Sequence, residues 1–330
     1  MNSVAGCDPT FNIYRSYITL EDLRIKTSTN NPTCDHVTAA DSDITAWEDP
    51  IVPNINGSPS TGSVGFVARG LYIDAGKGIG IKVRQDFSLV ENSEVHNTLE
   101  TFNCNATIFR NNVLYGADQY GSTITSKGGS RNIQIYNNIV HMTSSSWTEG
   151  LVLGGTSGPQ WDYDPSTGIE CYNCAAWNNV VINETGTYRD VLLMAGCKDC
   201  VMANNIGING SISMRWGGGA TQTAINAVWK NNILTCRGGK AIGQWWNTSG
   251  SLTVDANNFF NCSGVPSQAH ALSSDPLFLN ATSDWHVQSA SPVIGAGTEV
   301  IVPGYNAPNI DVSRDRDGKV RATPWNLGLY

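Results

Sequence analysis

An Asn-Asn doublet followed by an apolar pair recurs six times along the chain. The doublets begin at Asn111, Asn137, Asn178, Asn204, Asn231 and Asn257. Successive doublets are 26, 41, 26, 27 and 26 residues apart. A fixed period of about 20 to 50 residues is typical of a solenoid, in which each repeat packs against the next. The doublets therefore predict one continuous stack of coils.

Each repeat contains three short strand-like pieces. In the second repeat, residues 132–136 precede the doublet, 139–142 follow it, and 150–153 form the third piece. Asparagine tolerates the left-handed conformation of a tight turn, and its amide can bond to the same amide one coil away. Connections between parallel strands are right-handed. We therefore expect an all-β, right-handed parallel β-helix of about nine to ten coils with an asparagine ladder.

These repeats resemble the right-handed β-helix superfamily typified by pectate lyases. The segment that contains Asp275-Pro276-Leu277-Phe278 and Ser291-Pro292 is similar to the closing segment of many secreted β-helix repeat proteins. We expect that segment to cap the open end of the stack, since an unpaired coil would promote aggregation. The regions we expect are irregular N-terminal coils at 1–104 with a Pro/Gly loop at 48–62, regular coils at 105–274 with an insertion at 143–170, and the cap at 275–330.

Composition limits the partners. The net charge is −8 and no basic stripe is present, which argues against nucleic acid. No apolar run reaches the roughly 18 residues that a membrane span requires. Residues 1–7 show no basic-then-apolar leader. We expect an extracellular or surface-exposed protein, either secreted after removal of a leader or part of a virion.

Six of the nine cysteines occupy matching positions on neighbouring repeats. Stacked coils lie about 4.8 Å apart, within the Cα separation of a disulfide. Two alternatives stay open, a ladder of buried thiols and a zinc site made of two Cys-x-x-Cys pairs. The predicted disulfides are Cys171–Cys197, Cys174–Cys200 and Cys236–Cys262, with Cys7–Cys34 as a fourth candidate.

Alignment of the third strands predicts a binding face. The inner columns are Ile124, Leu151, Leu192, Ile212, Ile242 and Ser126, Leu153, Met194, Met214, Gln244, and the outer column is Lys127, Gly154, Ala195, Arg215, Trp245. Three coils separate Lys127 from Arg215, about 14 Å, which suits an oligosaccharide. We expect a shallow polysaccharide groove lined by Lys127, Arg215, Trp216, Trp245 and Trp246.

The 41-residue repeat carries about 15 extra residues, most of them in the insertion. Long insertions in solenoids cluster on the binding face. Trp147 and Trp161 could stack on sugar rings there, although tryptophans that plug the coil ends are the alternative. Asp162 and Asp164 are a weak calcium candidate, and we expect no other cofactor.

Two enzyme mechanisms compete. A lyase needs a base and a cation beside a uronate carboxylate. Ser126-Lys127-Gly128 looks like the Asn-Lys-Ser strand end of alginate and chondroitin lyases on this fold, which implies Lys127 as the base. The next coil lacks that family's arginine, so Arg131 or Arg189 would have to replace it. A glycosidase needs two carboxylates about 5 to 10 Å apart, and the candidates are Glu149, Asp162, Asp164 and Asp190.

We therefore predict an exported polysaccharide-binding β-helix protein, with a polysaccharide lyase as the activity to test. The alternative is a non-catalytic, self-assembling structural protein, such as a phage tailspike, a capsid decoration or an extracellular fibre subunit.

Overall fold

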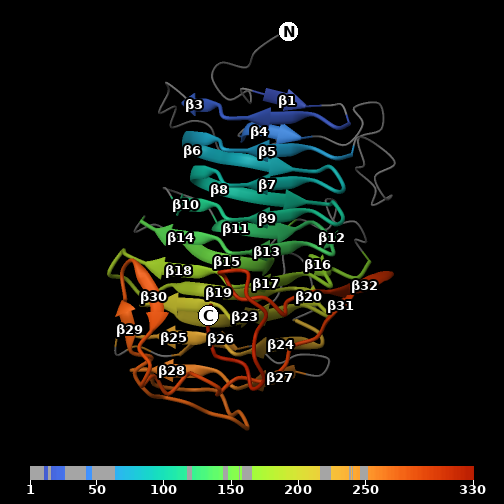
Figure 1. Cartoon of the computed structure of the whole chain (residues 1–330). Helices are drawn as coiled ribbons and strands as arrows, with labels where there is room; N and C mark the ends of the chain where they lie inside the picture. Colours follow the sequence, from blue (N-terminus) through green and yellow to red (C-terminus); the bar gives the residue numbers. More distant parts are fainter. Residues whose placement is uncertain are drawn as a thin grey trace.

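The computed structural model describes residues 11–13, 16–26, 42–46, 64–116, 121–143, 148–155, 157, 166–215, 224–237, 239, 241–245 and 252–330. The regular elements within these residues are all strands, stacked into a right-handed parallel β-helix (Figure 1). In this described part of the chain, no helix is long and apolar enough to cross a membrane.

One face of the helix is a nine-stranded parallel sheet with one strand from each coil. Its strands from β9 onward precede the asparagine doublets, and three earlier strands extend the sheet towards the N-terminus. They are β2 (Thr19–Glu21), β5 (Val67–Arg69), β7 (Leu89–Glu91), β9 (Ile108–Arg110), β13 (Gln134–Tyr136), β17 (Ala175–Trp177), β21 (Val201–Ala203), β24 (Ala227–Lys230) and β27 (Leu252–Asp255).

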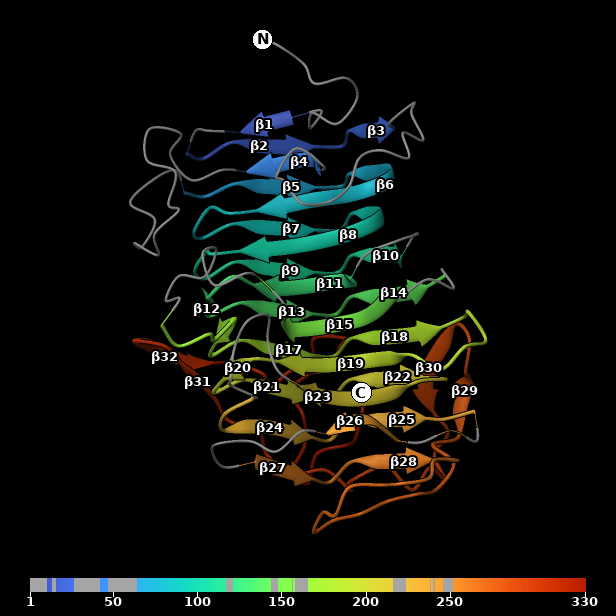
Figure 2. The same ribbon diagram turned by 180° about the vertical axis from the view of Figure 1, so that it is seen from behind.

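A sixteen-stranded sheet forms the two other faces (Figure 2). The strands after the doublets are β10 (Val113–Gly116), β14 (Ile139–Met142), β18 (Val180–Asn183), β22 (Ile206–Ile208), β25 (Ile233–Thr235) and β28 (Asn258–Phe260). The third strands are β11 (Gly121–Lys127), β15 (Thr148–Gly154), β19 (Asp190–Ala195), β23 (Ser211–Arg215) and β26 (Ile242–Trp245). The two faces join because β8 (Glu94–Phe102) pairs with both β10 and β11.

The remaining strands extend this sheet or lie outside it. At its N-terminal end are β1 (Phe11–Ile13), β3 (Arg24–Lys26), β4 (Ser42–Ala46) and the long β6 (Tyr72–Val83). A small corner sheet contains β12 (Ser130–Arg131), β16 (Cys171–Tyr172) and β20 (Cys197–Lys198). Two antiparallel hairpins near the C-terminus are β29 (Phe278–Asn280) with β30 (Asp284–Val287), and β31 (Val302–Gly304) with β32 (Ala307–Ile310).

The two asparagines of a doublet have different functions. The first one adopts the left-handed conformation, as at Asn137 with φ 58°. The second one points into the core and forms the ladder. The backbone N–H and the Nδ2 of Asn138 both donate to Asn179 Oδ1, each at 3.0 Å. Because each ladder amide bonds the coils on both sides, the ladder keeps the coils in register.

The sixth doublet is offset by one residue. Asn257 occupies the ladder position, where it accepts from Asn232, and Ala256 takes the left-handed position with φ 50°. In agreement, Ile233 of β25 pairs with Asn258 of β28. Gln268 ends the ladder, because its Oε1 accepts from the backbone N–H and Nδ2 of Asn257.

The inner columns expected from the alignment are present, with one exception. In the first column, each residue pairs with the next one on the neighbouring strand. This column contains Ile124, Leu151, Leu192, Ile212 and Ile242. In the second column, however, Met214 lies opposite Trp245 and not opposite Gln244. A register shift between β23 and β26 causes this difference and removes Trp245 from the expected outer column.

Residues 275–330 lie along the side of the stack, whereas we had expected them over its open end. The left-handed asparagines hold this segment from outside. Asn178 Nδ2 donates to the carbonyl of Arg314, and Asn231 Nδ2 donates to that of Thr298. The side chains on the outer surfaces of β18, β22 and β25 are apolar, and without this segment they would be exposed to water. An apolar cluster buries them under the segment, and its members include Val180, Ile206, Ile233, Trp285, Leu327 and Leu329.

The cysteine pairing agrees only in part with the prediction from the repeat. Cys236 and Cys262 form a disulfide between adjacent coils. The predicted bonds Cys171–Cys197 and Cys174–Cys200 are not formed, because Cys171 is bonded to Cys174 while Cys197 and Cys200 are thiols. All four sulfurs lie at one corner, so matching positions alone do not determine the pairing. Cys7 and Cys34 lie outside the described residues.

Candidate binding site

The floor of the expected groove is buried. One outer column of this surface contains Gly154 of β15, Ala195 of β19 and Arg215 of β23. Val152, Leu193 and Ala195 form an apolar cluster on this surface and are at most 1% exposed. Apolar side chains on an outer surface require cover, which an open sugar groove would not provide. The described part of the structure does not include several of the predicted site residues. These are Trp147, Trp161, Trp216, Trp246, Asp162, Asp164 and the side chain of Trp245.

Lys127 belongs to a buried charge cluster on the same surface. Glu100 of β8 is 2% exposed, and its carboxylate lies 2.8 Å from Lys127 Nζ and 3.2 Å from Lys82 Nζ. Burial alone would raise the pKa of Glu100, but the two ammonium groups lower it to about 2. Burial alone would lower the pKa of Lys127, but the attraction of the Glu100 carboxylate raises it above its usual value. Lys127 therefore keeps its proton more tightly than a free lysine does.

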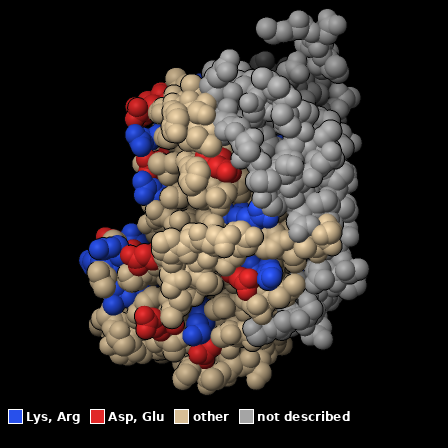
Figure 3. Space-filling view, turned by 90° about the vertical axis from the view of Figure 1, so that its right-hand side faces the viewer, with Lys and Arg blue, Asp and Glu red and all other residues tan. Residues whose placement is uncertain are grey.

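The other charged candidates on this surface also have protein partners. Arg215 forms an ion pair with Glu149, whose carboxylate also accepts from Ser122. Asp190 accepts from the hydroxyls of Ser211 and Ser213, each at 2.6 Å, and burial raises its pKa. Acidic and basic side chains lie side by side in Figure 3 as well. These pairs stabilise the surface but leave few charged groups available for a ligand.

The structure does not bring the three expected catalytic residues together. Lys127 ends β11 on the buried outer surface, whereas Arg131 ends β12 at the following corner. Arg189 precedes β19, so it lies at the opposite end of these parallel strands from Lys127. A single sugar unit would not contact all three.

A cavity of about 680 Å³ lies beside Arg131. We call it the hairpin cavity, because the β31–β32 hairpin forms one wall and the corner of the coils forms the other. Both ribbon views show this hairpin next to β20 (Figure 1, Figure 2). Its lining includes Asp86, Phe87, Asn103, Arg131, Asn132 and Tyr305.

Two aromatic rings position Arg131 in the wall of this cavity. Its guanidinium carbon lies 5.2 Å from the centre of the Tyr172 ring and 5.1 Å from that of Tyr305. Cation–π attraction favours both contacts. Asn132 anchors the hairpin, because its Oδ1 accepts from the Tyr305 N–H at 2.6 Å and its Nδ2 donates to the Tyr305 carbonyl at 3.1 Å. Arg131 is thus held rigidly where the coil and the hairpin meet.

Asn103 is the unusual residue of the cavity. Its side chain is 3% exposed, yet among the described residues neither its amide oxygen nor its amide nitrogen has a hydrogen-bond partner. An unpaired buried polar group costs about 1 to 3 kcal/mol, so native proteins rarely retain one without a function. Nearby, Asp86 accepts from the Asn105 N–H at 2.7 Å, and burial raises its pKa. Asn103 and Asp86 offer hydrogen bonds to a polar ligand.

Of these residues, only Arg131 is predicted from the sequence as a site residue. In the structure Asn103 has positive φ, 51°, like the first asparagine of a doublet. Its residue type is therefore a weak indication of a turn in the sequence. Its lack of a partner cannot be read from the chain. Tyr305 lies 173 residues beyond Asn132, so only the folded C-terminal segment brings it to the cavity.

Comparison with known proteins supports the fold. No family model and no curated protein matches the sequence. The complex of XylC with xylose is similar to this structure, with a TM-score of 0.51 and 11% identity over 96% of this chain and 65% of that one. The Dettilon tailspike protein has a TM-score of 0.44 and 15% identity over 65% of this chain and 42% of its own. The chain thus spans less than two thirds of either protein. The parallel sheets of its coils and the likeness to the XylC structure identify the chain as a right-handed parallel β-helix protein.

Proposed function

We propose that this protein binds polysaccharide and that the hairpin cavity holds one or more sugar units. The observation that carries the proposal is the unpartnered amide of Asn103, which lines the cavity beside the carboxylate of Asp86 and the guanidinium of Arg131. Sugar hydroxyls both donate and accept hydrogen bonds, so one hydroxyl pair can satisfy both ends of an amide. A sugar therefore supplies the partners that the protein does not.

The size and the aromatic residues of the cavity also support a sugar. Its volume lies within the roughly 300 to 1,000 Å³ that is typical of small-ligand sites. Phe87 lines the cavity and is 61% exposed, so its ring is available to stack on a sugar. Tyr305 lines the opposite wall, on the hairpin.

The replacement Asn103→Gly tests this proposal. Glycine accepts the positive φ of this position, so the change removes the amide without straining the backbone. Loss of two hydrogen bonds of about 1 kcal/mol each should weaken binding roughly 30-fold. The measurement is calorimetric titration with oligosaccharides selected from a panel of polysaccharides.

Asn92→Gly is the matched control, because Asn92 also has positive φ, 52°, but is exposed and outside the cavity lining. It should bind as the wild type does. Equal affinity of the Asn103→Gly and Asn92→Gly variants would refute the role of the cavity. Failure of the wild type to retain any polysaccharide would refute the function.

Lyase activity with Lys127 as the base stays a prediction. Only a neutral amine accepts a proton, and the pKa of Lys127 is raised, so we expect any lyase rate to increase with pH across the alkaline range. Lys127→Ala should then lower the formation of unsaturated product by about 100-fold or more. An unchanged rate would exclude this base. If no acidic polysaccharide gives product, the non-catalytic alternative, a tailspike, capsid decoration or fibre subunit, is favoured.

We also propose that the protein functions outside the cell or on a particle surface. The Cys236–Cys262 disulfide near the last coil supports this, because structural disulfides persist mainly in oxidising environments.

A further inference from the structure

Two Cys-x-x-Cys pairs meet at one corner of two adjacent coils. Cys171 of β16 lies opposite Cys197 of β20. Cys174 and Cys200 are opposite each other as well, because they directly precede Ala175 and Val201, which pair between β17 and β21. All four side chains are fully buried. The repeat thus places four sulfur ligands in one small volume of the core.

A left-handed residue inside each pair directs both of its sulfurs inward. Asn173 has φ 49° and lies between Cys171 and Cys174, and Asp199 has φ 55° in the second pair. The chain turns sharply at these residues, so the cysteines before and after the turn both face the interior. Two such turns stacked on each other resemble the paired knuckles of a four-cysteine metal site.

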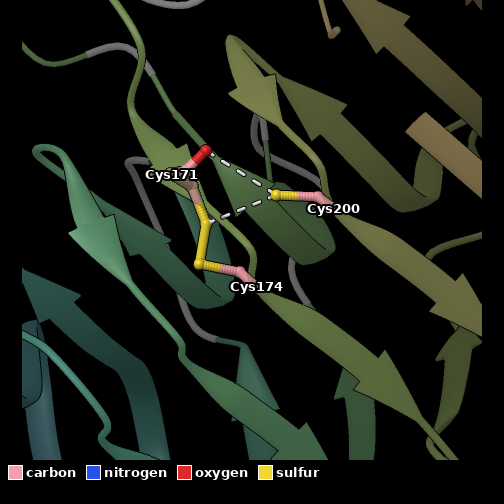
Figure 4. Close-up of side chains that lie close together, drawn as sticks. All are labelled: Cys171, Cys174 and Cys200. Carbon is pink, nitrogen blue, oxygen red and sulfur yellow. Dashed lines mark hydrogen bonds between the residues drawn. A yellow bond between two sulfur atoms is a disulfide. The ribbon is translucent and has the colours of Figure 1, made fainter. Parts of the chain in front are cut away.

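The sulfur positions suit a tetrahedral ion. The Sγ atoms of Cys171, Cys174 and Cys200 lie within 4.8 Å of one another. Figure 4 shows the three side chains close together, with Cys171 and Cys174 joined by the disulfide. Cys200 Sγ is 3.9 Å from Cys171 Sγ. In a tetrahedral site with Zn–S bonds of about 2.3 Å, the sulfurs lie about 3.8 Å apart. Cys197, whose thiol interacts with that of Cys200, is the fourth cysteine at this corner, and its Sγ lies outside this group of three.

The surroundings of the four cysteines also suit a metal ion. The Ser126 hydroxyl is 3.1 Å from Cys171 Sγ and can donate to a thiolate, as the outer partners of metal ligands do. On the next coil, the buried residues opposite Cys197 and Cys200 are Ala224 and Ala227, which take little space beside the sulfurs.

We propose that Cys171, Cys174, Cys197 and Cys200 bind one Zn²⁺ as a tetrathiolate when the Cys171–Cys174 disulfide is reduced. An external dithiol transfers two electrons and two protons to that disulfide and is itself oxidised to a disulfide. Binding of Zn²⁺ to the four thiols then releases their four protons. The metal links two coils through the core, and the disulfide and the zinc site exclude each other. This proposal is independent of polysaccharide binding.

The test uses the full chain, reduced with a dithiol, loaded with Zn²⁺ and freed of excess metal. We expect one zinc ion per chain by elemental analysis, and Cys200→Ser should lower this content at least tenfold. Cys104→Ser is the matched control, because Cys104 is a buried thiol outside the four-cysteine group, and it should keep the full zinc content.

Cobalt titration of the reduced wild type keeps the test decisive if the Cys200→Ser variant does not fold. Co²⁺ should produce the thiolate charge-transfer and ligand-field bands of a tetrahedral tetrathiolate, and Zn²⁺ should displace it. Absence of these bands from the folded, reduced protein would overturn the proposal, as would full zinc retention by Cys200→Ser. Neither result would affect the hairpin cavity.

Discussion

Replacement of Glu100 by glutamine should lower the free energy of unfolding at neutral pH by about 3 kcal/mol. The carboxylate lies between two ammonium groups, those of Lys82 and Lys127, and is 2% exposed. Glutamine has nearly the same shape but no charge, so Lys82 and Lys127, whose side chains are 12% and 28% exposed, would keep their positive charges without this counterion. Removal of one partner from a buried ion pair is therefore costly. Urea denaturation measures the loss.

The acid dependence of stability provides a second measurement of the same cluster. The pKa of Glu100 falls from an ordinary 4.5 to about 2 in the folded protein. A tenfold change in proton affinity corresponds to about 1.4 kcal/mol, so this decrease is equivalent to roughly 3 kcal/mol. Because the folded pKa is depressed, the contribution is complete above pH 4.5 and is lost as the pH falls towards 2. The stability difference between wild type and Glu100→Gln should shrink across that range.

Glu91→Gln is the matched control, since Glu91 also bridges two basic residues. Its partners, Arg69 and Arg110, are 43% and 36% exposed, so water can solvate them after the change. We expect a loss of about 1 kcal/mol or less. Equal losses for Glu91→Gln and Glu100→Gln would contradict the assignment of the larger effect to burial.

Asn179→Ala should lower the free energy of unfolding by about 3 to 5 kcal/mol, because it interrupts the asparagine ladder at its centre. Asn179 Oδ1 accepts two hydrogen bonds from Asn138, and its Nδ2 donates to the carbonyl of Ile135 and to Asn205 Oδ1. All of these groups are buried, so water cannot replace the lost partners. Urea denaturation and amide hydrogen exchange of the neighbouring coils measure the effect.

The matched control is Asn111→Gly, at the first position of a doublet. Asn111 is exposed and has φ 56°, a conformation that glycine adopts without strain. The change should alter stability by no more than about 0.5 kcal/mol. A comparable loss in both variants would show that the two asparagines do not differ in function.

The repeat in the sequence predicted the core well, for a local reason. Strand side chains alternate between inside and outside, and coils of equal length place equivalent residues above one another. The column from Ile124 to Ile242 follows from counting alone. Counting failed at Trp245 and at Asn257, where a register shift and a one-residue offset change the alignment. At the offset, Asn258 takes a column position that is apolar on the other coils, from Val113 to Ile233, so counting from the doublet alone did not indicate the change.

The candidate site was much less predictable. The alignment correctly placed Lys127 on an outer surface, but only the structure shows that Glu100 neutralises it and that the surrounding floor is buried. Arg131 was selected as a substitute cation for a lyase, and the structure places it between two tyrosine rings in a cavity. A residue's charge can be read from the chain, whereas its partners depend on segments that fold against it.

By itself, the sequence determined the coil, its turns and its register up to β23, because positive-φ asparagines and alternating apolar residues act between neighbours in the chain or in the stack. The tertiary structure alone decided how the C-terminal segment packs. That segment returns along the side of the helix and brings Tyr305 to Arg131 to close the hairpin cavity. The cysteines show both levels. Counting brought four of them to one corner and left disulfides, thiols and a zinc site as alternatives, and the structure adds that three of the sulfurs lie within 4.8 Å of one another. Long-range packing depends on the path of the whole chain, which no local pattern encodes.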